Sequence, residues 1–378
     1  MASHWKSAFF AVVAVLSLPG VVRGGCEYGT QASGARYILC TPSTNWNGGL
    51  VLYAHGYVPD GADEDAWKTQ LALPGGPSLP DLVTSYGFAF AASSFSKDGL
   101  AVLQGVDDTM DLIEVFKAKT NLEPQRVFVT GVSEGGLIAA KALEQYPSKL
   151  NGGLAACGPI GDFPKQINYF GDVRVLFDYF FPGMLGSAWK QTNITIPPGL
   201  MTDWDTHYAP AVAAALQANP LKTAQLISTG NIPIGLNPAN AGEGILSALW
   251  YNVFATNDAM DTLHGNPFDN RSRWYSGSLL DFWLNLRVAR FSADSDAVTE
   301  MAKYQTSGRL QRPLVTLHTA WDPVVPAWQE STYAKKVAAA GKSHLLVRYP
   351  VPRFGHCAFN EGEVLIAFLT MVLHPYSF

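Results

Sequence analysis

The sequence predicts an α/β fold, in which a mostly parallel central sheet is flanked by helices and interrupted by a large, mainly helical cap. Short apolar runs typical of buried strands alternate with helical segments over residues 25–161, and again over residues 310–378. Residues 162–309 lack this alternation, are dense in aromatic side chains, and contain expected helices at 209–226 and 243–257. The 378 residues are enough for one large domain with such an insertion. We therefore expect a two-part core with the cap inserted after the sixth core strand.

The first part of the core begins with apolar runs bounded by turn residues, which predict strands over residues 36–40, 49–54 and 88–92. The second of these strands is almost continuously apolar, as expected for a strand buried on both faces. An amphipathic helix is expected over residues 100–119, because apolar residues recur three and four positions apart, at Leu103, Val106, Met110, Ile113 and Phe116.

The next strand and helix enclose the most informative motif of the chain. An apolar run at residues 127–129 predicts a buried strand, and residues 137–146 predict a helix that Pro147 ends. Between them, Gly131-Val132-Ser133-Glu134-Gly135 matches the G-x-S-x-G nucleophile elbow. The elbow serine has a strained backbone, and larger residues in place of the glycines would collide with the neighbouring elements. Ser133 is thus the predicted nucleophile; the alternative is a plain turn between a strand and a helix.

The rest of the core repeats the pattern of strand, loop and helix. A short strand is expected over residues 154–157. After the cap, strands are expected over residues 313–318 and 344–349, and helices over residues 328–340 and 361–373. Asp322 and His356 each lie just after one of these later strands. A serine needs a base within hydrogen-bonding distance, and the base needs an acid that orients it. The chain order Ser133, Asp322, His356 is the order of the α/β-hydrolase triad.

With these three motifs, the sequence resembles the α/β-hydrolase superfamily over nearly the whole chain outside the cap and the N-terminal segment. The resemblance implies an α/β-hydrolase fold with Ser133 as nucleophile, Asp322 as triad acid and His356 as general base. The Asp-Pro-Val-Val-Pro setting of Asp322 and the Gly355-His356 pair are similar to the acid and histidine loops of that superfamily. Other acids and bases fit the pattern less well by their position in the chain: His318, His344, His374, Asp294, Asp296 and Glu330.

Two backbone N–H groups are expected to form the oxyanion hole. In this fold one donor follows the nucleophile and the other lies in the loop after an earlier strand. These positions correspond to Glu134 and to Tyr57 in His55-Gly56-Tyr57. His55 precedes the nucleophile in the chain, so we expect it to shape the loop rather than to act as the base.

The subfamily is less clearly defined. Cys357 beside His356 is similar to tannases and feruloyl esterases, in which a cysteine beside the histidine is bonded to one beside the serine. This sequence departs from that pattern, because Val132 precedes Ser133. The Gly-x-Ser-Glu-Gly-Gly elbow also resembles serine exopeptidases of this fold, but no propeller repeat accompanies it.

The N-terminus is expected to be a signal peptide over residues 1–24. Lys6 precedes an apolar stretch at residues 7–18, Pro19-Gly20 ends it, and small residues allow cleavage before Gly25. A membrane anchor and a buried first helix are the alternatives. We therefore expect a secreted protein, or a periplasmic one if the source is bacterial.

In an oxidising compartment, four cysteines suggest two disulfides. Cys26 and Cys40 flank a short hairpin-like segment, which leaves Cys157 with Cys357, although four cysteines allow three pairings. Asn193 and Asn270 begin glycosylation sequons, which are meaningful in a eukaryotic protein.

The composition excludes several classes of protein. Hydrophobic residues make up 48% and charged residues 15%, with a net charge of −5. A nucleic-acid-binding protein would need a basic face, so no nucleic-acid partner is expected. The N-terminal apolar stretch is short for a bilayer span, so no stable membrane insertion is expected. The spacing of Cys and His fits no zinc site, and we expect neither metal nor organic cofactor.

The predicted function is that of a secreted serine hydrolase that cleaves carboxylic esters through an acyl-enzyme. The aromatic cap favours a small ester substrate with an apolar or aromatic portion. A secreted exopeptidase or amidase, an acyltransferase or lyase acting on a biosynthetic intermediate, and a catalytically silent binding protein are the alternatives. The sequence does not define the oligomeric state.

Overall fold

The structure is a computed structural model that describes residues 24–73, 75–186 and 194–373. Its centre is a sheet of eight strands in the order β1-β2-β4-β3-β5-β6-β7-β8. The strands from β3 to β8 and the β3–β4 pair run parallel, whereas β1 and β2 pair antiparallel at one edge. Their bounds are β1 Gly25–Thr30, β2 Arg36–Thr41, β3 Gly49–Ala54, β4 Ala89–Ser93, β5 Arg126–Val132, β6 Gly152–Ala156, β7 Leu314–Trp321 and β8 Leu346–Phe354.

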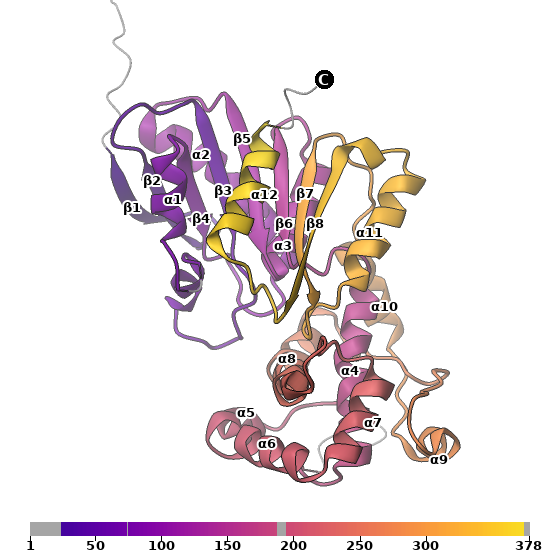
Figure 1. The fold of residues 1–378 in the computed structure, drawn as a ribbon. Helices are drawn as coiled ribbons and strands as arrows, with labels where there is room; N and C mark the ends of the chain where they lie inside the picture. Colours follow the sequence, from indigo (N-terminus) through magenta and orange to yellow (C-terminus); the bar gives the residue numbers. More distant parts are fainter. Residues whose placement is uncertain (1–23, 74, 187–193, 374–378) are drawn as a thin grey trace, which may run out of the picture.

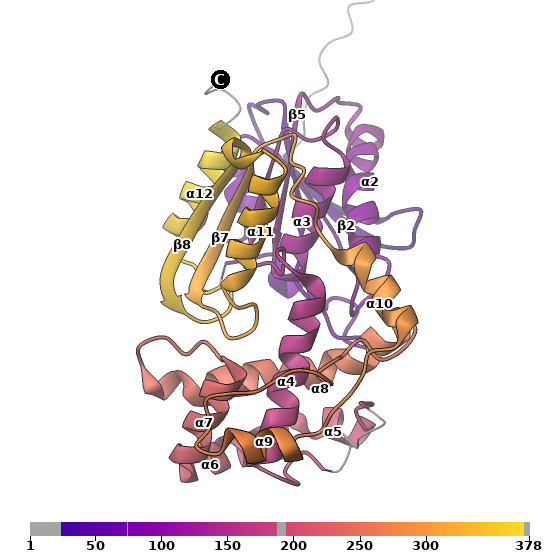
Figure 2. The same ribbon diagram turned by 90° about the vertical axis from the view of Figure 1, so that its right-hand side faces the viewer.

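Helices cover both faces of the sheet (Figures 1 and 2). One face carries α1 (Leu79–Ser85) and α12 (Glu361–Leu373), and the other carries α2 (Val102–Thr120), α3 (Glu134–Gln145) and α11 (Trp328–Ala339). Short 3₁₀ helices occupy two connections, η1 (Ala66–Gln70) and η5 (Ser343–Leu345). A separate apolar cluster lies between the helices and each face of the sheet. The inner strands are therefore buried on both faces.

The cap lies beyond the carboxyl ends of the parallel strands, below the sheet in Figure 1. It leaves the core after β6, the sixth strand in the chain. Its elements are α4 (Phe163–Phe180), α5 (Pro198–Thr202), η2 (Trp204–Tyr208), α6 (Ala209–Ala218), α7 (Pro220–Gly230), η3 (Pro238–Asn240), α8 (Ala241–Thr262) and α9 (Asp281–Arg287). They enclose an apolar cluster of their own, to which α4, α6, α7 and α8 contribute.

The end of the predicted insertion packs on the core. Ala297 and Met301 of α10 (Ser295–Met301) and Tyr304 of η4 (Ala302–Tyr304) belong to the apolar cluster that α2 and α3 form with the sheet. Lys141 of α3 also donates from Nζ to the carbonyl of Lys303 at 2.7 Å. The segment before β7 therefore connects the cap to the core rather than covering the site.

Several elements differ from the sequence prediction for local reasons. The expected helix over residues 209–226 is two helices, α6 and α7, because Pro220 cannot continue the first one. Helices α1 and α4 were not predicted, because their apolar residues show no clear helical period. Each begins after a capping side chain, Ser78 for α1 and Asp162 for α4, and has a proline in its first turn. Strand β1 was expected only as part of a hairpin-like segment.

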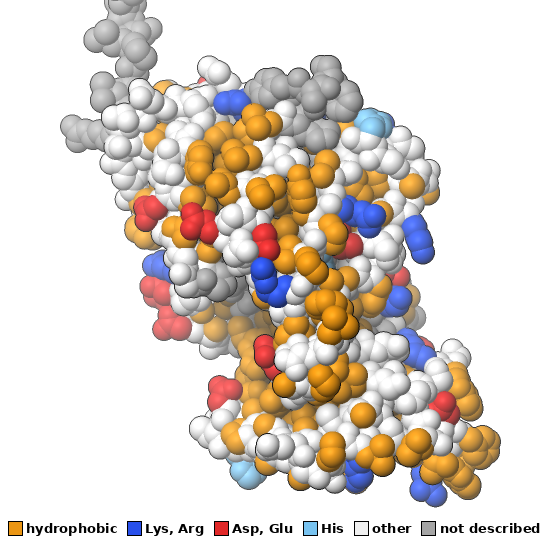
Figure 3. All heavy atoms as spheres, viewed as in Figure 1, with side chains coloured by type: hydrophobic (Ala, Val, Ile, Leu, Met, Phe, Trp, Pro, Cys, Tyr) orange, Lys and Arg blue, Asp and Glu red, His pale blue; other side chains and the backbone are white. Residues whose placement is uncertain are grey.

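Exposed apolar side chains gather around α9, at the lower right of Figure 3. They are Trp274, Leu279, Leu280, Phe282, Trp283 and Leu286. No helix of the residues described here is long and apolar enough to cross a membrane.

Candidate active site

Ser133 lies in the turn between β5 and α3 with a backbone φ of 56°, a value that L-residues seldom adopt. The glycines around it are sterically required. A Cβ on Gly131 would lie 1.9 Å from the carbonyl oxygen of Gly135, and one on Gly135 would lie 2.0 Å from that of Ala54. Only glycine lets the strand, the turn and the helix come this close.

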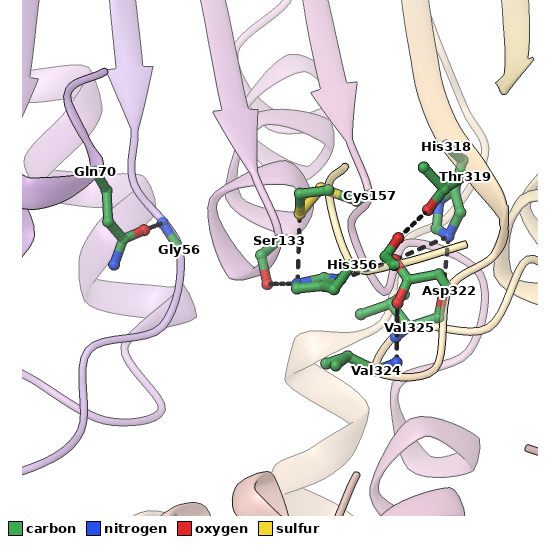
Figure 4. The surroundings of a disulfide bond; sticks show 12 residues. Gly56, Gln70, Ser133, Cys157, His318, Thr319, Asp322, Val324, Val325 and His356 are labelled. Carbon is green, nitrogen blue, oxygen red and sulfur yellow. Dashed lines mark hydrogen bonds and ion pairs between the residues drawn. A yellow bond between two sulfur atoms is a disulfide. The ribbon is translucent and has the colours of Figure 1, made fainter. Parts of the chain in front are cut away.

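Asp322 and His356 reach Ser133 from the two loops that follow β7 and β8 (Figure 4). The Nε2 of His356 is 2.8 Å from the Oγ of Ser133, and its Nδ1 is 2.7 Å from the Oδ2 of Asp322. The structure thus brings together three residues that are 223 and 34 positions apart in the chain. The order of the contacts, hydroxyl to imidazole to carboxylate, is that of a serine hydrolase triad.

Asp322 is fully buried and held by its own loop. The N–H groups of Val324 and Val325 both donate to its Oδ1, at 2.8 and 2.9 Å, so that Oδ2 is directed to His356. These two hydrogen bonds close a turn at Asp322, because an aspartate side chain readily accepts from backbone N–H groups that follow it closely in the chain. Burial without these donors would be costly for a carboxylate.

A second histidine and acid lie behind Asp322. His318 on β7 is buried, with Nε2 2.7 Å from the carbonyl of Val325 and 3.8 Å from the Oδ2 of Asp322. Its Nδ1 is 3.5 Å from Glu330, whose other oxygen accepts from the hydroxyl of Thr316 at 2.5 Å. Burial lowers the pKa of His318, but the Glu330 and Asp322 carboxylates and the Val325 carbonyl outweigh it and raise the pKa. His318 therefore supports the acid loop rather than contacting Ser133.

Both cysteine pairs favoured from the sequence are disulfides in the structure, Cys26–Cys40 and Cys157–Cys357. The first joins β1 to β2 at the edge of the sheet. The second joins the residue after β6 to the residue after His356, and the Sγ of Cys357 lies 3.4 Å from His356 Nε2. Together with His356 these two sulfurs form a close group, but as a disulfide they offer no thiolate for a metal ion.

The proposed oxyanion donors are the backbone N–H groups of Tyr57 and Glu134. Glu134 is the first residue of α3, so its N–H is among the amides that have no acceptor within their helix. Tyr57 is in the loop after β3, and Tyr57, Ser133 and Glu134 line one cavity. Gln70 of η1 holds this loop through two hydrogen bonds. Its Oε1 accepts from the N–H of Gly56 at 2.8 Å (Figure 4). Its Nε2 donates to the carbonyl of Tyr57 at 3.2 Å.

Two side chains beside the elbow are buried and have perturbed pKa values. Burial raises the pKa of Glu134 to about 8, although its Oε1 accepts from the N–H of Ala101 at 2.9 Å. Burial lowers the pKa of His55 to about 4, against the effect of its bond to the Gly56 carbonyl. The His55 ring is stacked on Phe95 with centroids 4.0 Å apart, and no contact with Ser133 is found among the residues that the structure describes. It shapes the loop, as expected from its place in the chain.

The cap contributes Tyr251 of α8 to the site. Burial and the charge of Asp322 raise the pKa of the Tyr251 hydroxyl, and the neighbouring Ser133 side chain partly offsets this rise. The Tyr251 ring meets His356 edge to face at 6.3 Å and also packs on Tyr57. The hydroxyl of Tyr57 in turn donates to the carbonyl of Phe254 at 3.2 Å, which ties the core loop to α8.

Two cavities meet at Ser133. A cavity of about 110 Å³ lies under the cap, between Leu137, Phe163, Ile167, Phe170 and Phe268. A larger cavity of about 400 Å³ lies between α1 and α12 on the opposite side of the nucleophile, and His356 and Cys357 line it. Ser133, Tyr57 and Tyr251 are common to both.

The glycosylation sequons have different outcomes. Asn193 lies outside the described residues. At Asn270 the structure contradicts the prediction: the side chain is fully buried, and its Nδ2 donates to the hydroxyl of Tyr275 and the carbonyl of Ala289. A glycan needs this nitrogen at the surface, so Asn270 is a structural residue of the cap.

Two contributors were missed in the sequence, and a third, Glu330, was considered in another role. Gln70 gave no signal, because a glutamine in a polar loop is ordinary. Glu330 was weighed as a triad acid, but it lies in the first turn of α11 and contacts His318 and Thr316 instead. Tyr251 was one aromatic among many in the cap, and only the folded chain distinguishes it.

The strand order, the parallel crossovers and the elbow after β5 define an α/β-hydrolase fold, which confirms the predicted fold class. No protein-family model and no curated protein match the chain.

Solved structures similar to the chain include the acylaminoacyl peptidase of Pyrococcus horikoshii, with a TM-score of 0.47 and 12% identity over 93% of this chain and 41% of that one. They also include a rice cell wall degrading esterase, LipA, from Xanthomonas oryzae, with a TM-score of 0.44 and 14% identity over 92% and 87% of the two chains. A third is alpha/beta hydrolase domain-containing protein 10 from mouse, with a TM-score of 0.42 and 12% identity over 93% and 100%. The chain spans about two fifths of the length of the acylaminoacyl peptidase.

Proposed function

We propose that the protein is a serine hydrolase that cleaves carboxylic esters through an acyl-enzyme. The observation that carries this proposal is the continuous contact from Ser133 to His356 to Asp322, at 2.8 and 2.7 Å. A hydroxyl within hydrogen-bonding distance of an oriented imidazole is the arrangement that makes serine nucleophilic near neutral pH.

In this mechanism, the Oγ of Ser133 attacks the ester carbonyl while the Nε2 of His356 takes its proton. The negative charge that develops on the carbonyl oxygen is stabilised by the N–H groups of Tyr57 and Glu134. His356 then gives the proton to the leaving alcohol as the bond between carbonyl carbon and alcohol oxygen breaks. Water, deprotonated by His356, attacks the acyl-enzyme and releases the acid, while Asp322 stabilises the imidazolium in both steps.

The chemistry of the cavities favours esters over peptides. Among the described residues that line them, Glu134 is the only acid and there is no lysine or arginine. Because burial raises the pKa of Glu134 to about 8, this carboxyl is mainly neutral at pH 7 and is a weak anchor for a substrate amine. An exopeptidase needs a charged anchor for a terminus, which these walls do not supply.

Secretion is part of the proposal and is supported by the two disulfides, which persist mainly in oxidising compartments. The predicted signal peptide, residues 1–24, falls almost wholly outside the described residues.

The test is labelling with a fluorophosphonate, followed by mass mapping of the modified peptide. We expect labelling confined to Ser133, lost in Ser133→Ala and strongly slowed in His356→Ala. Ester and aminoacyl-amide substrates with the same acyl group are then compared. Turnover of the ester alone supports an esterase, comparable turnover of the amide favours the amidase alternative, and absence of labelling in folded protein contradicts the hydrolase proposal.

A further inference from the structure

The two cavities at Ser133 differ in what they offer to the two halves of an ester. Every ester places its carbonyl carbon at the nucleophile, its acyl group on one side and its alcohol on the other. Because Ser133, Tyr57 and Tyr251 line both cavities, a substrate bound at Ser133 can extend into each of them. The question is which half enters which cavity.

His356 fixes the direction. Its Nε2 must lie beside the leaving oxygen, because it gives that oxygen the proton that it took from Ser133. His356 lines only the cavity between α1 and α12, whereas Glu134, a proposed oxyanion donor, lines only the cavity under the cap. The leaving alcohol therefore lies on the α1–α12 side, and the acyl group lies under the cap.

The two cavities also differ in size, so the two halves of the ester have different amounts of room. The α1–α12 cavity, of about 400 Å³, is within the usual range for a ligand pocket, and the cavity under the cap, of about 110 Å³, is well below it. Large aromatic side chains occupy the space under the cap, with Phe163 and Phe268 buried and Phe170 half-buried. Only a small acyl group fits there without moving these rings.

The walls of the larger cavity are mainly apolar, with aliphatic and aromatic side chains. Leu79, Leu82 and Val83 project from α1, and Val364 and Leu365 project from α12 on the other side. Polar side chains in the lining include Thr69, Gln70 and Thr130, and the tyrosines Tyr53 and Tyr86 also line the cavity. This face of the molecule, with α1 and α12 toward the viewer, carries many apolar side chains in Figure 3. Such walls favour a hydrocarbon or aromatic group over a sugar or a charged group.

We propose that the substrates are esters of a small carboxylic acid with a bulky, apolar alcohol, which binds between α1 and α12. This inference rests on the proposed function. In acylation, the bond between Ser133 Oγ and the acyl carbon forms, the bond from that carbon to the alcohol oxygen breaks, and the proton of Ser133 passes through His356 to the alcohol. The free alcohol leaves from the α1–α12 side, and water takes its place beside His356.

Two isomeric esters test the proposal: octyl acetate, whose long chain is on the alcohol, and methyl nonanoate, whose long chain is on the acid. Their overall hydrophobicity is the same, so the ratio of their kcat/KM values reports which half of the ester finds room. We expect octyl acetate to be preferred by at least about tenfold. Among acetates, kcat/KM should rise by up to about fourfold for each methylene that the cavity buries.

Variants on two different helices locate the effect. Leu82→Trp on α1 and Leu365→Trp on α12 both fill the larger cavity, and each should lower the ratio of octyl acetate to methyl nonanoate by about tenfold. The matched control is Ile366→Trp, because Ile366 is 56% exposed on the same helix and outside the cavity. It should leave the ratio unchanged. Thermal unfolding of each variant shows whether it is folded. If one of the two cavity variants does not fold, the other is sufficient for the test.

The proposal and the function on which it rests fail in different ways. Three outcomes overturn the inference alone. The protein prefers methyl nonanoate, or neither cavity variant changes the ratio of the two kcat/KM values. In the third, the protein hydrolyses neither isomer although its Ser133 still reacts with a fluorophosphonate. Absence of that labelling overturns the serine hydrolase itself.

Discussion

Cys157 and Cys357 join the end of β6 to the residue that follows His356, across 200 positions of the sequence. Both residues have a positive φ, 46° and 51°, so each lies at a sharp bend of the backbone. The disulfide therefore fixes the histidine loop to the strand beside the nucleophile strand. It also borders the proposed alcohol cavity through Cys357.

Removal of this disulfide should lower both stability and activity. For a closed loop of 200 residues, the chain-entropy model predicts a loss of about 5 kcal/mol in the free energy of unfolding. In Cys157→Ala/Cys357→Ala, His356 also loses its fixed position, so we expect kcat to fall by about tenfold or more with a smaller change in KM. Steady-state kinetics and urea unfolding of the same preparations measure the two effects.

The chain supplies its own control for that variant. Cys26→Ala/Cys40→Ala opens a disulfide of separation 14 at the edge of the sheet, away from Ser133. The chain-entropy model predicts a loss of about 3 kcal/mol in stability for a loop of that size. Its kcat, measured per folded molecule, should be close to that of wild type. An equal fall in kcat for both double variants would show that the effect on catalysis is not local.

Gln70 should act as a positioning residue for the oxyanion loop. In Gln70→Ala the N–H of Gly56 and the carbonyl of Tyr57 lose their shared partner, so the loop that carries the proposed Tyr57 donor is held less firmly. We expect kcat to fall by roughly 10- to 100-fold, less than or similar to the loss of an oxyanion donor, with little change in KM. Rescue distinguishes this role from a general loss of structure: Gln70→Glu keeps the acceptor for Gly56 and should recover part of the rate. Equal kcat values for Gln70→Ala and wild type would contradict the assignment.

Because the Glu134 carboxyl is buried, the free energy of unfolding of the wild type should fall as the pH rises. Its folded-state pKa of about 8 is above the unfolded value of 4.5, so the folded chain binds this proton more tightly. The contribution is fully present below pH 4.5 and is lost as the pH rises toward 8. Glu134→Gln keeps an acceptor for the Ala101 N–H but does not titrate. The free energy of unfolding of this variant, relative to that of wild type, should therefore rise by on the order of 4 kcal/mol between pH 4.5 and pH 8.5. Urea unfolding at several pH values measures the difference, and parallel curves for the two proteins would disprove the shift.

The core and its three central residues were predictable because their signals are local. The glycines around Ser133, the apolar strands and the loops that end in Asp322 and His356 each follow from a few neighbouring residues. Within the cap, helix α4 was missed. It has apolar residues on all sides because it contacts both the core and the other cap helices, which removes the periodic signal. The contacts of Gln70 are with residues 13 or more positions away, and those of Tyr251 at the site are with residues 105 or more positions away. No local pattern reports such contacts. Asn270 was predicted wrongly for the same reason, since a sequon carries no information on burial.

Tyr251 provides the last prediction, because it is the residue through which the cap reaches the nucleophile. Tyr251 lines both cavities with Ser133, the Ser133 side chain affects the pKa of its hydroxyl, and its ring packs against His356 and Tyr57. Tyr251→Phe keeps the ring and both cavity walls but removes the hydroxyl. A hydrogen bond that orients the Ser133 hydroxyl contributes roughly 0.5–1.5 kcal/mol, so we expect kcat and the rate of fluorophosphonate labelling to fall together by about 2- to 10-fold, with KM nearly constant. Tyr251→Ala removes the wall as well and should raise KM in addition. A change in KM alone for Tyr251→Phe would mean that the hydroxyl contacts the substrate and has no part in orienting Ser133.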